Sequence, residues 1–102
     1  MSVEGTYECT LKTPLGKKKG TLVVVPSADG QRFTGNLSNS LLGSVDITDG
    51  TLDGDVLIFQ VAVTKPKRMN VECEIVVDGD DLVGIVTAGM FGELKLSGQR
   101  IG

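Results

Sequence analysis

Aspartates that stand directly before glycine are the first residues of this chain that could carry chemistry. One run spans residues 29–43 and a similar run spans residues 78–92, and each opens on Asp-Gly and ends on glycine. An Asp-Gly run followed by spaced glycines can form a phosphate or metal loop. Aspartate before glycine also supplies the positive φ and local hydrogen bonds of a hairpin turn. We favour turns, with calcium as the alternative, because the spacing does not follow the EF-hand loop.

Catalytic side chains are scarce in the sequence. Histidine, the usual general base and commonest metal ligand, is absent. Tyr7, Cys9 and Cys73 are the only titratable side chains that strand alternation turns inward, and they do not form a triad. Acid–base or nucleophilic catalysis needs titratable groups that converge in a pocket. We therefore predict no catalytic residues, no cofactor and no metal site, and we favour a protein that is not an enzyme.

The two cysteines are most simply small core residues. Cys9 and Cys73 match neither a zinc spacing nor a disulfide framework. A disulfide needs Cα atoms within about 7 Å, and the strands that carry these cysteines are not neighbours in the fold predicted below. A reactive thiolate needs a cationic neighbour, and the sequence places none near either cysteine.

Basic residues gather at two predicted turns, residues 17–19 and residues 65–68. In an up-and-down sheet these turns share one end with two apolar loop tips, and the aspartates collect at the other end. The sequence thus predicts a basic, apolar end and an acidic end. Solvated basic turns and apolar plugs for the barrel end are the alternatives to a binding site. The candidate ligand-binding residues are Lys17, Lys18, Lys19, Lys65, Lys67, Arg68, Leu41, Leu42, Met90 and Phe91.

The elements that must position these residues are strands. Tyr7, Cys9 and Leu11 alternate with polar residues, which is the period-2 pattern of a strand with one buried face. No segment shows a helical period. Asp49-Gly50 and Asp53-Gly54 are expected in the connection at the middle of the chain. The predicted strands cover residues 5–13, 21–25, 33–38, 45–47, 57–63, 69–77, 82–86 and 94–96.

The two Asp-Gly runs belong to an internal duplication. Gly30 and Gly79, like Gly35 and Gly84, lie 49 positions apart, and the apolar residues around them fall in step. The repeats cover about residues 5–53 and 54–102 of a single domain, residues 1–102.

Eight short strands with tight turns predict an all-β fold, a single eight-stranded antiparallel up-and-down barrel of the lipocalin or streptavidin type. Closure removes the exposed edges that would otherwise invite aggregation. A flattened sandwich is the alternative. Gly35 and Gly84 are expected where the strands bend or bulge. The inward positions, including Leu11, Leu22, Val24, Phe33, Val45, Phe59, Val71, Ile75 and Leu96, are almost wholly apolar.

Composition limits the possible partners and location. The chain has 102 residues and a net charge of −3, which disfavours a broad phosphate-binding surface. The N-terminus lacks the features of a secretory signal, and no apolar run approaches the roughly 18 residues of a membrane helix. We expect a cytoplasmic protein without nucleic-acid binding or membrane insertion, and with an oligomeric state that the sequence leaves open.

A family resemblance rests on turn and core residues. They are Gly5-Thr6-Tyr7, Lys12-Thr13-Pro14-Leu15-Gly16, Lys19-Gly20-Thr21-Leu22, Asp29-Gly30 with Gly35, and Phe91-Gly92. The chain resembles a small bacterial and archaeal domain found alone or attached to the C-terminus of flavin-dependent oxidoreductases of the old yellow enzyme type. That family usually has tryptophan where this chain has Tyr7. The resemblance implies a β fold and brings no settled function and no catalytic residues to carry over to this chain.

Three functions are compatible with these features. The first is a non-catalytic accessory or interaction module that binds a partner enzyme. The second is a carrier that holds a small apolar or amphipathic anionic ligand inside the barrel, with entry at the basic, apolar end. The third, ranked last, is an enzyme that folds an apolar substrate into a reactive shape. A filled interior would favour the first, and a cavity would favour the second.

Overall fold

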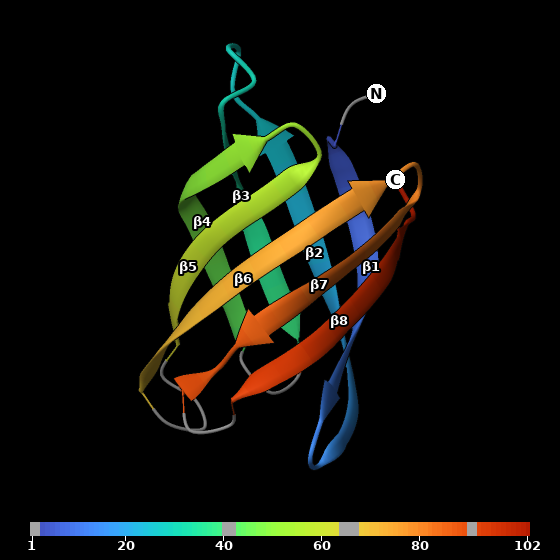
Figure 1. Ribbon diagram of the computed structural model, residues 1–102, viewed down its shortest axis with the longest axis vertical. Coiled ribbons are helices and arrows are strands. Elements are labelled where there is room, and N and C mark those ends of the chain that lie inside the picture. Colours follow the sequence, from blue (N-terminus) through green and yellow to red (C-terminus); the bar gives the residue numbers. More distant parts are fainter. Residues whose placement is uncertain (1–2, 40–42, 64–67, 90–91) are drawn as a thin grey trace.

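The computed structural model describes residues 3–39, 43–63, 68–89 and 92–102, which form a closed barrel of eight antiparallel strands (Figure 1). Each strand pairs with the next, and β1 also pairs with β8, which closes the sheet. The predicted up-and-down barrel is confirmed, and the sandwich alternative is excluded. The strands are β1 (Gly5–Thr13), β2 (Gly16–Pro26), β3 (Arg32–Asn39), β4 (Gly43–Asp53), β5 (Val56–Val63), β6 (Met69–Asp78), β7 (Asp81–Thr87) and β8 (Glu93–Arg100).

Strand alternation sets which side chains enter the barrel. In β6, Val71, Cys73 and Ile75 are buried, while Glu72 and Glu74 between them are exposed. The β-branched residues suit this half-buried, pleated surface. Of the inward positions named from the sequence, all are buried except Val45, which is half-buried and packs against the core.

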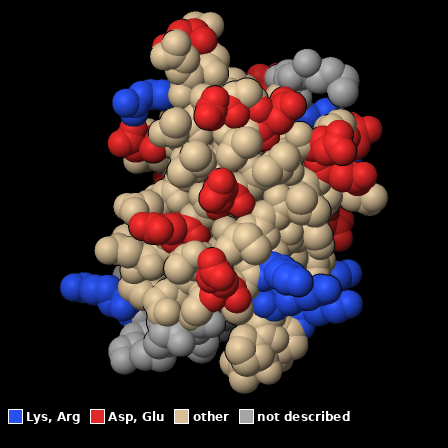
Figure 2. All heavy atoms as spheres, in the orientation of Figure 1, with Lys and Arg blue, Asp and Glu red and all other residues tan. Residues whose placement is uncertain are grey.

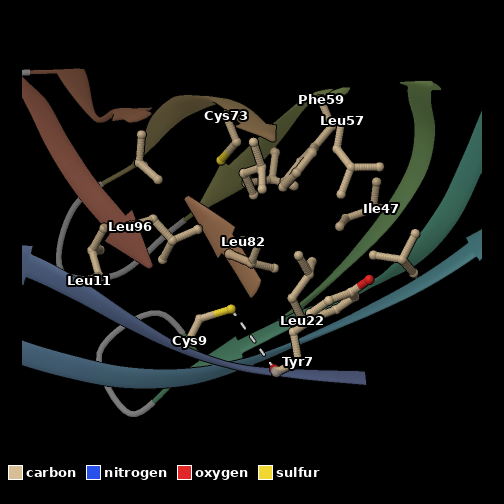
Figure 3. Packing of buried hydrophobic residues seen from close by; sticks show 14 of the residues in the cluster. Tyr7, Cys9, Leu11, Leu22, Ile47, Leu57, Phe59, Cys73, Leu82 and Leu96 are labelled. Atoms are coloured by element: carbon tan, nitrogen blue, oxygen red, sulfur yellow. Dashed lines mark hydrogen bonds between the residues drawn. The ribbon is translucent and has the colours of Figure 1, made fainter. Parts of the chain in front are cut away.

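The buried residues form one apolar cluster inside the barrel (Figure 3). Tyr7, Leu22 and Leu57 are completely buried, and no described residue buried there is polar or charged. Phe33 and Phe59 meet edge to face, with ring centroids 5.7 Å apart, the arrangement that the quadrupoles of two aromatic rings favour. Side chains from opposite walls thus pack together in the described interior.

The first hairpin turn differs from the prediction. Residues 17–19 lie within β2, and the turn consists of Pro14 and Leu15, because Thr13 pairs with Gly16. The Thr13 hydroxyl accepts a hydrogen bond from the Leu15 amide at 3.1 Å and donates one to the Gly16 carbonyl at 2.7 Å. Because these bonds and the fixed φ of proline close a tight turn, the three lysines continue the strand.

The prediction for the middle of the chain was also wrong in part. Asp49 and Gly50 lie within β4, and the connection to β5 begins only after Asp53. Gly50 is buried, and a Cβ there would overlap the Phe33 ring. The packing of Phe33 over Gly50 therefore keeps an Asp-Gly pair, usually a turn signal, in an extended strand.

Gly35 and Gly84 lie where the neighbouring backbone comes too close for a side chain. A Cβ at Gly35 would collide with the Val23 carbonyl oxygen, and one at Gly84 would lie 2.6 Å from the Glu74 carbonyl oxygen. The β3–β4 register shifts between Phe33 and Gly35, which is the irregularity expected of a bulge. Thr34 lies opposite two residues of β4, Thr48 and Asp49, so the bulge is in β4 beside Gly35 and not at Gly35 itself. Gly84 shares the close approach, and the register around it is regular. The duplication itself remains an observation on the sequence.

Candidate functional site

The two cysteines are free and buried in different walls of the barrel (Figure 3). Burial raises the pKa of Cys73 to about 12, and burial together with the neighbouring Glu8 carboxylate raises the pKa of Cys9 to about 11. Both thiols are therefore protonated at neutral pH. The core-residue interpretation holds, and the disulfide and reactive-thiolate alternatives do not.

Tyr7 is part of a polar cluster at the acidic end of the barrel. Its hydroxyl donates a hydrogen bond to the Val3 carbonyl and accepts one from Arg100 Nη2, both at 2.7 Å. The Arg100 guanidinium carbon lies 5.2 Å from the centre of the Tyr7 ring, within cation–π range, and Nη1 lies 3.2 Å from an Asp80 carboxylate oxygen. These contacts give Tyr7 a structural role.

The contribution of Arg100 was missed by the sequence reasoning. Leu94 and Leu96 in β8 are buried, and the same alternation continues through Gly98 to a half-buried Arg100. Extending the period-2 pattern to the end of the strand would have identified it.

Among the described residues, acidic and basic side chains separate along the barrel axis, as predicted. Acidic side chains predominate at the end that carries both termini, and lysines gather around the β1–β2 hairpin at the other end (Figures 1 and 2). Two arginines also lie at the acidic end, where Arg32 pairs with Asp49 and Arg100 pairs with Asp80. The aspartates predicted for this end are Asp29, Asp49, Asp53, Asp55, Asp78, Asp80 and Asp81.

The structure describes four of the candidate ligand-binding residues. Lys17, Lys19 and Arg68 are exposed and Lys18 is half-buried. Because side chains alternate along β2, Lys17 and Lys19 lie on the outer wall and Lys18 on the opposite face, so the three do not converge on the mouth. The remaining candidates, Leu41, Leu42, Lys65, Lys67, Met90 and Phe91, lie outside the described residues.

Strand pairing brings together cations that are far apart in the sequence. Lys12 of β1 stands opposite Lys17 of β2 on one side and opposite Lys95 of β8 on the other. We call these three exposed residues the lysine row. Lys12 and Lys95 were missed by the sequence reasoning, although each follows an inward-facing leucine and therefore points outward.

A second outward feature is apolar. Ile58, Val76, Val83 and Ile85 are exposed on the outside of strands β5 to β7, where Val76 pairs with Val83. A hollow beside Val76, Val83 and Ile85 is also lined by Gly84, Glu74, Lys12 and residues of β8 that include Lys95. This hollow and three others on the described residues are lined mainly by side chains of the outer wall.

The fold and surface define a small closed β-barrel with an apolar interior and oppositely charged ends. No family model matches the chain, and no curated protein matches it. Among solved structures, the chain is similar to a redesigned β-barrel, with a TM-score of 0.77 and 14% sequence identity over 98% of this chain and 92% of that one. This similarity shows the fold alone.

Neither a metal centre nor a membrane-crossing helix is found in the described parts of the chain. No three carboxylate, cysteine or histidine side chains there come together as metal ligands. Nor do these parts contain a helix long and apolar enough to cross a membrane.

Proposed function

We propose that the protein is a non-catalytic β-barrel module that acts through contacts on its outer surface. The observation that carries this proposal is the filled interior, where described side chains from β1 to β8 pack into one apolar cluster. Exposed apolar side chains lie on β5 to β7, and lysines that form no ion pair with the described residues lie on β8, β1 and β2. Both are features of surfaces that meet a partner. A cytoplasmic location, expected from the sequence, belongs to the same proposal. So does a partner enzyme, which the resemblance to domains attached to flavin-dependent oxidoreductases implies.

The carrier hypothesis requires a different interior. A site for a small ligand typically encloses about 300 Å³ or more and buries most of the ligand. In this barrel the side chains of Tyr7, Leu22 and Leu57 are fully buried on the inner side of the sheet. Two hollows on the described residues, each lined by outward-facing side chains, open to the outside. These observations favour the module over the carrier.

Native mass spectrometry of protein purified from cells without denaturation tests the proposal. We expect the mass of the bare chain, and we expect no saturable response when a fluorescent fatty acid is titrated into the protein. The same sample measured after denaturation supplies the reference mass. A native mass shifted by a bound fatty acid or similar ligand, absent after denaturation, would instead support the carrier.

A further inference from the structure

The lysines of the lysine row repel each other, and no described carboxylate neutralises them. Neighbouring strands lie about 4.8 Å apart, and Lys12 stands directly opposite Lys17 and Lys95. Like charges directly opposite each other in a sheet are destabilising. None of the three forms an ion pair with a carboxylate of the described residues. Three ammonium groups are thus held together on one surface without a neutralising partner.

An exposed apolar side chain lies beside this positive charge. Leu15, at the tip of the β1–β2 hairpin, is 74% exposed, and the hairpin projects beyond the barrel at the basic end (Figure 1). The Thr13 hydroxyl holds the turn through its hydrogen bonds to Leu15 and Gly16. Leu15 thus lies at the end of the projecting hairpin, and lysines lie on both of the hairpin's strands.

Acidic residues are distributed unevenly between the two ends of the barrel. The aspartates of the β2–β3, β4–β5 and β6–β7 connections lie at the opposite end of the barrel (Figures 1 and 2). Acidic residues on the same outer face include Glu93, two residues before Lys95, and Glu74, two strands from it. An extended anionic surface would therefore attract the hairpin end and repel the other end.

We propose that the β1–β2 hairpin docks on the surface of a lipid bilayer that carries anionic headgroups. The lysine row faces the lipid phosphates, and Leu15 enters the boundary between headgroups and acyl chains without crossing the membrane. Interfacial helices combine apolar side chains, which enter this boundary, with lysines and arginines on their polar face, and the hairpin offers the same two kinds of side chain. Basic residues next to an anionic leaflet are attracted to it. This inference rests on the proposed function, in which the outer surface makes the contacts.

The described residues favour a bilayer over nucleic acid. Proteins that bind single strands stack the bases on aromatic side chains, whereas Tyr7, Phe33 and Phe59 are all buried here. Binding to a nucleic acid would also leave the exposed Leu15 without a role.

Cosedimentation of the full chain with vesicles tests the inference. We expect binding to phosphatidylcholine vesicles that contain phosphatidylglycerol, weakening as salt is added, and no binding to pure phosphatidylcholine. Lys12→Gln should weaken binding about fivefold, because one lysine near an anionic surface contributes about 1 kcal/mol. Arg32→Gln, which removes the same charge at the opposite end, should leave binding unchanged and is the matched control.

A second variant separates the apolar contribution from the charge. Leu15→Ser should weaken binding by a similar factor at every salt concentration, whereas Lys12→Gln should also reduce the dependence on salt. Circular dichroism checks that each variant is folded, which we expect because both positions are exposed.

Three results would overturn the inference: no preference for anionic vesicles, equal losses in Lys12→Gln and Arg32→Gln, or tighter binding to polyglutamate or single-stranded DNA than to vesicles. Any of them leaves the proposed module intact if native mass spectrometry shows the bare chain. A retained ligand inside the barrel would contradict the module whatever the vesicles show.

Discussion

At the scale of single residues, the clearest consequence of burial concerns the two thiols. Cys9 and Cys73 have a pKa of about 11 and about 12, above the ordinary value of 9.0. A pKa that is raised in the folded state contributes stability that is present below pH 9.0 and is lost as the pH rises toward these values. We expect the free energy of unfolding to fall between about pH 9 and pH 11, as measured by urea denaturation.

The matching variant is Cys73→Ala. It should show a smaller decrease over the same pH interval, because one of the two titrating thiols is gone. An identical decrease in the variant and the wild type would mean that the Cys73 thiol does not contribute. In the folded wild type at neutral pH, both thiols should also react slowly with a disulfide reagent, because buried neutral thiols are inert.

The Tyr7 hydroxyl is the second residue whose contacts predict a measurable effect. Tyr7→Phe removes the hydrogen bond to the Val3 carbonyl and the one from Arg100. Leaving a buried group without its partner costs about 1–3 kcal/mol, so we expect a loss of that size in the free energy of unfolding. A change close to zero would show that these hydrogen bonds do not stabilise the acidic end.

At the scale of elements, the strand glycines set how closely neighbouring strands approach. Gly35→Ala would drive a methyl group into the Val23 carbonyl oxygen. Overpacking typically costs about 1–3 kcal/mol and occasionally more, and a clash with backbone places this variant at or above the upper limit. The control is Gly102→Ala, whose added carbon would meet only Thr6 Cβ, at 3.8 Å. Equal stability of the two variants by urea denaturation would contradict the close approach of β2 and β3.

Because the lysines of the row repel each other, Lys12→Gln should weaken binding to anionic vesicles but stabilise the fold. Lys12→Gln removes two repulsions between directly opposed lysines, and cross-strand pairs are each worth about 0.2–1 kcal/mol. The variant should therefore be slightly more stable than the wild type in low salt, with a gain that shrinks as salt is added. Thermal unfolding at two salt concentrations measures this. A destabilised variant in low salt would show that repulsion in the row is negligible.

Local patterns predict the strands better than they predict where the strands end. Alternation identified the buried face of β6 because burial there follows a period of two. It could not place residues 17–19 in β2, since that depends on the bonds of the Thr13 hydroxyl. It could not keep Asp49 and Gly50 in β4 either, because Phe33, from a different strand, covers Gly50.

The candidate site was predicted in outline only. Charge alternation between connections indicated which end is basic, because antiparallel strands reverse direction at each turn. The lysine row depends on the pairing of β1 with β8, which joins residues from opposite ends of the chain. Such long-range register is not visible in local sequence.

At the scale of the whole molecule, closure and interior packing determine what the barrel can do. The sheet has no free edge among the described strands, because β1 pairs with both β2 and β8. The interior is occupied by the chain's own side chains, and the separated charges lie on the outside.

Xenon binding followed by ¹²⁹Xe NMR tests the filled interior most directly. Xenon enters apolar cavities created by truncating buried side chains, so Leu57→Ala, at a fully buried position, serves as the positive control. We predict a saturable xenon shift for Leu57→Ala and none for the wild type. A saturable shift in the wild type as large as that in Leu57→Ala would reveal an interior cavity and contradict the account of the protein as a filled module.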